Sequence, residues 1–227
     1  MAMALIAPVV VDGLFTGKVG FLPGESRGSA IAKDPVSGRC VIGSEGLAGD
    51  EHADPRAHGG DEKAVHLFPV EHHEALAAAF PGARHLVPGG LGENLSTRGI
   101  TEEQACIGDV FALGTVRLQI AQPRTPCWKI DIRCRVEGVA AFVAEHGIAG
   151  WYFRVLTPGE CVAGDALTHI ERPAGAVSLA RFNRSVAVKR PALAVLDELA
   201  NAPGLAQDWV RKIRDRMDWL LRNGEAS

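Results

Sequence analysis

Short apolar runs separated by Gly, Pro and Asp fill the chain from residue 14 to about residue 171, a pattern typical of many short strands joined by turns. Two runs repeat one another, because Gly108-Asp109 and Gly164-Asp165 each precede an alternating apolar segment, as in a tight turn that feeds a strand. We predict strands after both turns and further strands at residues 17–21, 29–32, 64–68, 116–121 and 151–156. The pattern favours a barrel or a sandwich.

Helical patterns interrupt and then follow the strands. Two helices are predicted among the strands, at residues 70–80 and 139–146, the second ended by Gly147, a favoured C-terminal capping residue. Three more are predicted at the C-terminal end, at residues 178–188, 191–200 and 205–221, the first of them capped by Ser178. We therefore expect an α+β protein, mainly β, with a β domain over residues 16–171 and a three-helix domain over residues 176–222.

The last predicted helix carries an apolar stripe. Its members recur at helical spacing and are Trp209, Val210, Ile213, Met217, Leu220 and Leu221. Each C-terminal helix is too short to be stable alone, so the stripe predicts packing in a small core. A face that docks a partner protein is the alternative.

Charge is nearly balanced over the 227 residues, with 24 Lys and Arg against 27 Asp and Glu and a formal net charge of −3. Nucleic-acid binding needs a clustered excess of basic side chains, so we expect no nucleic-acid partner. The apolar stretch at residues 4–11 follows no basic residue and is too short to span a bilayer, so we expect a cytoplasmic protein without membrane association. The five cysteines form no C-x-x-C pair, which argues against a disulfide framework and a structural zinc site.

The most informative segment reads Gln-Pro-Arg-Thr-Pro-Cys-Trp-Lys. Pro123 and Pro126 fix φ and lack a donor N–H, so we expect the segment to leave the preceding strand as a stiff loop. Cys127 is then presented rather than packed, and the charges of Arg124 and Lys129 favour its thiolate, the form that attacks electrophiles and binds metals. The alternative is a small buried apolar residue.

Two further segments are candidates for ligand binding. Gly59 and Gly60 permit positive φ, so their N–H groups can form an anion-binding nest to which Lys63 and Arg56 add charge. A plain hairpin connection is the alternative there. Farther along, three glycines precede Glu93-Asn94, where an amide side chain can read a polar ligand edge, although turn residues account for this loop equally well.

A metal clip is a third alternative for the glycine segment, because Asp50, Asp54 and His58 are spaced at i, i+4 and i+8. Pro55 argues against it, since a proline pushes the preceding residue out of the helical region. Zinc also needs a third or fourth ligand at a recognisable spacing.

Two other motifs are set aside. Residues 24–28 match G-x-S-x-G, but the nucleophile elbow of a serine hydrolase requires a helix directly after the Ser, and the sequence leaves no room for one. His72 and His73 point about 100° apart on the predicted helix, so they cannot clasp one metal, and we expect them at the surface.

In their order along the chain, the His-Gly-Gly turn with its following Lys, the Gly-Glu-Asn loop and the Pro-x-x-Pro-Cys segment resemble the MOSC family, named after the C-terminal domain of molybdenum cofactor sulfurases. The match is best with its stand-alone bacterial, YiiM-like branch. The resemblance implies a closed β-barrel of the kind inserted in pyruvate kinase, a three-helix appendage and a bound pyranopterin molybdenum cofactor. It implies that Cys127 is the molybdenum ligand or a sulfur carrier. The other positions that match the family motifs are His58, Gly59, Gly60, Lys63, Glu93, Asn94 and Arg124.

Related enzymes reduce N-hydroxylated bases and amidoximes, so the resemblance implies an oxidoreductase for small substrates of this kind. A thiolate suits soft molybdenum, and the phosphate of the cofactor suits the glycine nest with Lys63, Arg124 and Lys129 nearby. His58 is a candidate proton donor or a structural histidine. The chain has room for neither a pyridoxal-phosphate domain nor a cluster of iron–sulfur cysteines, so the electrons of such a reaction come from a separate reductase.

Other functions stay open at this point. Cys127 can instead carry a persulfide in a non-redox sulfur or cofactor carrier, and a small-molecule-binding barrel without chemistry is a third possibility. The sequence does not give the physiological substrate, the electron donor or the oligomeric state, a homodimer included. We assign the remaining cysteines to packing: Cys40, Cys106, Cys134 and Cys161.

Overall fold

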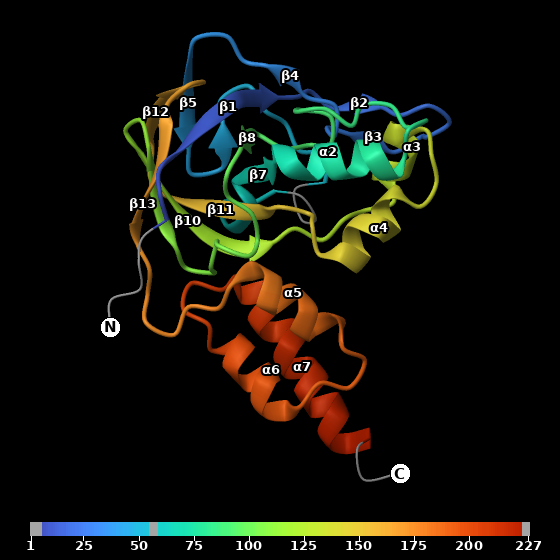
Figure 1. The fold of residues 1–227 in the computed structure, drawn as a ribbon, viewed down its shortest axis with the longest axis vertical. Helices are drawn as coiled ribbons and strands as arrows, with labels where there is room; N and C mark the ends of the chain where they lie inside the picture. The colour runs from blue at the N-terminus through green and yellow to red at the C-terminus, as the bar shows by residue number, and fades with distance from the viewer. Residues whose placement is uncertain (1–5, 55–58, 224–227) are drawn as a thin grey trace.

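Seven strands close into a barrel in the computed structural model, which describes residues 6–54 and 59–223 (Figure 1). The strands of the main sheet are β1 (Val9–Thr16), β4 (Asp34–Pro35), β7 (Val65–Pro69), β8 (Leu95–Thr97), β9 (Val110–Leu113), β10 (Val116–Pro123), β11 (Trp151–Thr157) and β13 (Ala166–Glu171). Their order is β13-β9-β10-β11-β7-β8-β1-β4, and β1 also pairs with β13, so the ring closes with β4 as an added strand. The predicted closed barrel is confirmed.

Smaller strands and one 3-10 helix lie around the barrel. They are β2 (Gly20–Phe21), β3 (Gly28–Ser29), β5 (Arg39–Gly43), β6 (Gly46–Leu47), β12 (Gly159–Val162) and η1 (Asp61–Lys63). The hairpin of β2 and β3 is shorter than the two strands predicted there, and the sheet of β12, β5 and β6 was not predicted. The rejected G-x-S-x-G motif lies in the turn between β2 and β3, with no helix after it.

The two Gly-Asp repeats form the same turn. In each, the Asp N–H donates to the carbonyl three residues earlier, and the Asp carboxylate accepts the N–H of that same residue: Cys106 for Asp109 and Val162 for Asp165. The strands that follow, β9 and β13, pair antiparallel in the barrel. The repeated motif therefore predicted two turns correctly, and the two turns lead into adjacent strands of the barrel.

The barrel strands differ from the prediction at β1, β8 and β10. β8 was not predicted, although it pairs with β7 and β1. β1 was not predicted, although it pairs with β13, β8 and β4. β10 was expected to end before Pro123, yet it continues to Pro123, which pairs with Trp151 of β11. β9 pairs with β10 only as far as Gln119, so the proline lies where the strand has lost one neighbour and its missing N–H is tolerated.

Three helices pack beside the barrel: α2 (Val70–Ala79), α3 (Lys129–Cys134) and α4 (Val139–His146). Together with Phe68 of β7 they enclose a second apolar cluster that includes Leu76, Ile130 and Val143. α2 and α4 match the predictions. α3 was not predicted, and it begins two residues after Cys127. No helix within the described ranges is long and apolar enough to cross a membrane.

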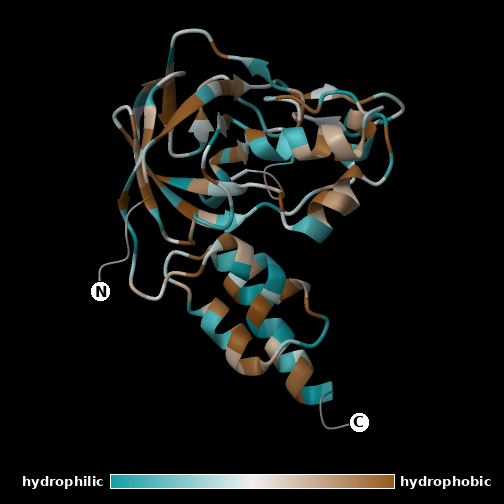
Figure 2. Ribbon diagram, viewed as in Figure 1, coloured by the Kyte–Doolittle hydropathy of each residue, from teal (hydrophilic) through white to brown (hydrophobic). Residues whose placement is uncertain are grey.

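The C-terminal appendage consists of α5 (Leu179–Ala187), α6 (Leu193–Ala200) and α7 (Gln207–Asn223), which lie together below the barrel in Figure 1. Ser178 caps α5 as predicted, because its side chain accepts the N–H of Arg181. Apolar and polar segments alternate along these helices in Figure 2, as in helices with one buried side. Most of the α7 stripe packs against the barrel's own core cluster, and only Leu221 is exposed, so the core-packing interpretation is confirmed.

Candidate functional site

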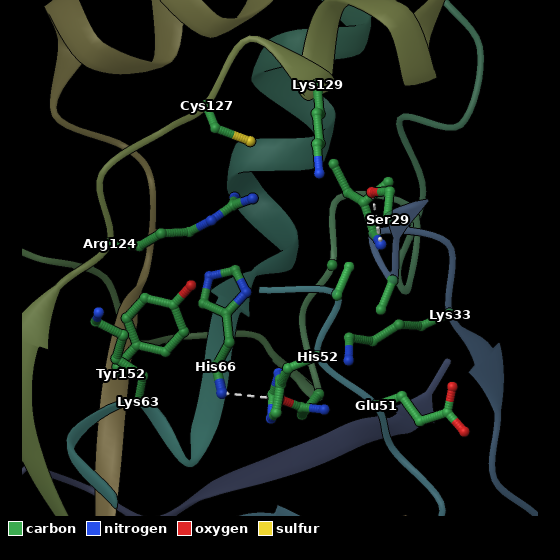
Figure 3. A pocket seen from close by; sticks show the side chains of 15 residues that line it. Ser29, Lys33, Glu51, His52, Lys63, His66, Arg124, Cys127, Lys129 and Tyr152 are labelled. Carbon is green, nitrogen blue, oxygen red and sulfur yellow. Dashed lines mark hydrogen bonds between the residues drawn. The ribbon is translucent and has the colours of Figure 1, made fainter. Parts of the chain in front are cut away.

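A pocket opens beside the β2–β3 hairpin, lined by residues from several elements (Figure 3). Strand β7, the end of β10, the start of α3 and the segment after β6 all contribute to its wall. The polar side chains among its lining residues are Ser29, Lys33, Glu51, His52, Lys63, His66, Asn94, Arg124, Cys127, Lys129 and Tyr152. The pocket therefore brings together side chains from all three segments that the sequence singled out.

Cys127 is presented at this pocket as predicted. Among the five cysteines, all of which fall within the described residues, Cys127 alone is half-buried and the other four are buried. Its carbonyl accepts the N–H of Ile130, so the start of α3 fixes the backbone that carries the thiol. The side chains of Cys127, Arg124 and Lys129 point into the same space in Figure 3.

Arg124 brings into the pocket a charge that forms no ion pair with the described residues. The residue is 8% exposed, its backbone N–H donates to Gly150, and its Nη2 donates to the carbonyl of Leu91 at 2.8 Å. Within the described part of the chain, its other terminal nitrogen, Nη1, is buried without a hydrogen-bond partner. A buried guanidinium with an unused donor is costly unless an anion or water completes it, so the pocket is suited to a negatively charged group.

Three lysines line the same pocket. Lys129 Nζ donates to the carbonyl of Gly28 at 2.8 Å, which holds α3 against the β2–β3 hairpin. Lys33 is paired with the buried carboxylate of Asp50; burial lowers the pKa of Lys33, and Asp50 opposes that shift. Lys63, directly after the glycine turn, is the third. Because Asp50 pairs with Lys33 and Glu51 also lines the pocket, the basic side chains that remain to give it positive character are Lys63, Lys129 and Arg124.

Several pocket residues were not found in the sequence analysis, among them Ser29, Lys33, His66 and Tyr152. The last two are paired across β7 and β11. Burial, and then the charge of Arg124, lower the pKa of His66 to about 3, so its ring is neutral at neutral pH. Its Nε2 lies 3.2 Å from the carbonyl of Ala149, which makes this nitrogen the donor. Burial raises the pKa of Tyr152 against the lowering effect of Arg124, so the phenol keeps its proton. Alternation within a strand was the only available signal for either residue.

Glu93 and Asn94 support the pocket by hydrogen bonds to the segments that line it. Glu93 is fully buried and absent from the pocket lining; it accepts the N–H groups of Gly89 and Leu91 and lies 2.7 Å from Nε2 of His73. Burial alone would raise its pKa, but the hydrogen bond and charge of His73 bring the pKa of Glu93 below its ordinary value. The Leu91 carbonyl held in this way is the acceptor of Arg124.

Asn94 does line the pocket, but its amide is used internally. Its Oδ1 accepts the N–H of His66, and its Nδ2 donates to Phe15 and Asp50. The side chain therefore fixes β7 and the pocket floor and has little capacity left to read a ligand edge.

The sequence profile that matches the chain is that of the MOSC domain, over residues 54–168. The chain belongs to the MOSC domain family. Protein YiiM of Escherichia coli (strain K12) is 34% identical over 207 residues, which cover 89% of this chain and 90% of that protein. The crystal structure of YiiM from Geobacillus stearothermophilus superimposes with a TM-score of 0.79 at 28% identity and covers 92% of this chain and all of that one. The expected membership in the YiiM-like branch is confirmed.

A longer relative carries a functional name. A protein of Gibberella moniliformis (strain M3125 / FGSC 7600) named Reductase is 36% identical over 188 residues, which cover 82% of this chain and 33% of that protein. This chain therefore corresponds to about a third of the Gibberella protein.

The MOSC glycine turn is partly described. Gly59 is buried, and Gly60 has a φ of 91°, a region that favours glycine, directly before η1. Neither glycine lines the pocket, while Lys63 at the end of η1 does. His58 and Arg56, the other two residues predicted for this turn, lie outside the described residues.

The alternative of a metal clip finds no support in Asp50. Its carboxylate already accepts Lys33, Asn94 and, at 2.7 Å, the N–H of Gly17. Within residues 6–54 and 59–223 no group of three or more His, Cys, Asp and Glu side chains is arranged to hold a metal ion. His58, the third residue of the clip, is not among them.

The surface prediction for His72 and His73 was wrong, because both are buried. His73 contacts Glu93, and His72 Nε2 lies 2.6 Å from Glu102. Both faces of α2 that carry these histidines are covered by neighbouring segments, so residues about 100° apart on the helix both contact buried carboxylates. Each histidine thus anchors an acidic residue of a neighbouring loop.

Proposed function

We propose that this protein is a molybdenum-cofactor-dependent reductase of small N-hydroxylated compounds, of the hydroxylaminopurine or amidoxime type. The observation that carries the proposal is the half-buried thiol of Cys127 beside the buried Nη1 of Arg124, which has no hydrogen-bond partner among the described residues. Membership in the MOSC family and the Reductase name of the Gibberella relative support the same reading.

The residues of the pocket fit such a cofactor. A pyranopterin carries a phosphate, and Arg124, Lys63 and Lys129 would hold it, because charge-assisted hydrogen bonds to phosphate are the strong ones. Cys127 would complete the coordination of the metal, since a thiolate is a soft ligand. When bound, the cofactor supplies two-electron oxygen-atom-transfer chemistry.

The overall reaction needs two electrons and two protons: R–NH–OH + 2 e⁻ + 2 H⁺ gives R–NH₂ and H₂O. The N–O bond breaks, and a separate reduced carrier supplies the electrons. Because the pKa of His66 is about 3, its protonated form is scarcely populated at neutral pH, and His66 is not the proton donor. Tyr152 keeps its proton and can donate a hydrogen bond to the oxygen of the substrate.

The test starts from protein produced in a host that makes the cofactor. Molybdenum content and the fluorescence of the oxidised pterin report binding, and 6-hydroxylaminopurine or benzamidoxime with reduced methyl viologen reports turnover. We expect both in the wild type, and loss of turnover in Cys127→Ser with the pterin retained. Cys106→Ala is the matched control, because it removes a buried thiol outside the pocket.

The carrier function remains the second candidate, favoured by the accessibility of the Cys127 sulfur. Bound pterin with no turnover of either substrate would support it, as would a persulfide on Cys127 in the mass spectrum of the intact protein. Protein with neither molybdenum and pterin nor a Cys127 persulfide would refute both functions.

A further inference from the structure

Glu62 joins the glycine turn to the helical appendage. Its carboxylate oxygens accept the backbone N–H of Gln207, the first residue of α7, at 3.2 and 3.0 Å. One of them also accepts Nη2 of Arg154 in β11 at 2.9 Å. On the main chain, the carbonyl of Glu62 accepts Nε2 of Gln122 in β10 at 3.0 Å. A single residue of η1 is therefore held by two barrel strands and by α7.

Lys63 follows Glu62 in the same short 3-10 helix. Its N–H donates to the carbonyl of Gly60, which closes the turn, and its side chain lines the pocket while that of Glu62 lies against α7. Neighbouring residues of a 3-10 helix point about 120° apart. Fixing Glu62 on the appendage side therefore fixes the direction in which Lys63 leaves the turn.

The two partners of the Glu62 carboxylate, Arg154 and the start of α7, are themselves held by hydrogen bonds to the barrel. Arg154 is held in place by Gln119, whose Oε1 accepts its Nη1 at 2.9 Å. Next to Gln207, the N–H of Ala206 donates to the carbonyl of Ala121 in β10, so the start of α7 is docked on the barrel by its backbone. A carboxylate at a helix N-terminus satisfies an otherwise orphaned donor and favours the positive end of the helix dipole.

We propose that Glu62 is a positioning residue that uses the first turn of α7 to hold Lys63 in the pocket, so that the appendage takes part in binding an anionic ligand. The proposal rests on the proposed function only for the identity of the anion. It gives the three helices a function beyond completing the core, since their docking sets the position of one of the pocket's cations.

A double-mutant cycle tests this on cofactor-free full-length protein, with pyrophosphate as the probe and calorimetric titration as the assay. Lys63→Met should weaken binding about tenfold, and Glu62→Ala about fivefold, the loss expected when a charged contact to phosphate becomes misplaced. In the Lys63→Met background, Glu62→Ala should add nothing. Glu62→Gln keeps an acceptor for Gln207 and should restore part of the affinity.

Hydrogen–deuterium exchange of the peptide that covers residues 59–69 supplies a readout without any ligand: Glu62→Ala should raise its exchange. Glu198→Gln, which removes an exposed ion pair with Arg181 inside the appendage, is the control and should change neither measurement. Additive losses in the cycle, or unchanged exchange, would overturn the proposal. If the wild type binds no pyrophosphate, the phosphate site of the proposed function is refuted, and the exchange result alone decides whether Glu62 fixes the turn.

Discussion

Replacing Glu93 by Ala should be among the most destabilising single changes in this fold. The carboxylate is fully buried and takes three hydrogen bonds, from Gly89 N–H at 2.7 Å, from Leu91 N–H at 3.0 Å and from His73 Nε2 at 2.7 Å. Alanine leaves all three donors buried without a partner.

The magnitude follows from the cost of such groups. An unsatisfied buried donor costs about 1–3 kcal/mol, and breaking a buried charge pair costs about 3–5 kcal/mol in total, so we expect a loss of about 4 kcal/mol in the free energy of unfolding. For a protein of 150–250 residues each kcal/mol shifts the melting temperature by about 2–4 °C, so the midpoint should fall by about 8–16 °C.

Guanidinium denaturation followed by far-UV circular dichroism measures the change on purified, cofactor-free protein. Glu74→Ala is the matched control, because Glu74 forms an exposed ion pair with Arg98 and should change the free energy by less than about 1 kcal/mol. A Glu93→Ala protein within about 1 kcal/mol of the wild type would contradict the reasoning, since the three donors would then have found other partners.

Glu93 should also make the stability of the fold depend on pH in the acid range. The pKa of Glu93 in the folded protein lies below its ordinary value of 4.5, so the ionised form stabilises the fold fully above that pH. The stabilisation is lost as the pH falls from about 4.5 through the folded pKa. Glu93→Gln should therefore lose stability at neutral pH but show a shallower decline below pH 4.5 than the wild type.

Three further predictions concern single positions. The ring of His66, with its pKa lowered to about 3, should show no protonation by NMR between pH 8 and 5, and its burial should cost stability as the pH falls from 6.5 towards 3; a midpoint above about 5 would contradict this. Gly150→Ala should destabilise by about 3 kcal/mol or more in thermal unfolding, because φ is 72° and the added Cβ would lie 2.1 Å from the carbonyl oxygen of Leu67, whereas Gly82→Ala meets open space and should be nearly neutral. Ser178→Ala should cost about 1 kcal/mol by loss of the α5 cap, again by denaturation, and no change would mean that another acceptor replaces it.

Local sequence signals predicted what local interactions determine. The Gly-Asp turns, the Ser178 cap and the ends of α4 depend on contacts within a few residues, and each was found where the pattern placed it. The presentation of Cys127 also follows from its immediate neighbours. The family motifs then supplied the closure of the barrel, which no local signal contains.

What failed depends on contacts far apart in the chain. His72 and His73 were predicted at the surface. Their buried carboxylate partners lie 30 and 20 residues away in the chain, respectively, so no local pattern could reveal them. β1 is specified by pairing with β13, at the other end of the barrel sequence. The family motif assigned Glu93 to the cofactor site, while the structure places it behind the pocket, because a buried acid and an exposed one look alike in a sequence.

The pairing of β1 with β13, which closes the barrel, determines when the barrel can close during synthesis. Val10 of β1 pairs with Ala166 of β13, so β1 leaves the ribosome long before β13 has been synthesised. Until then one flank of β1 offers unpaired backbone groups, a template for mispairing with other nascent chains. Completion of the ring is thus a late, long-range event with a high cost in loop-closure entropy, because it waits for the residues of β13.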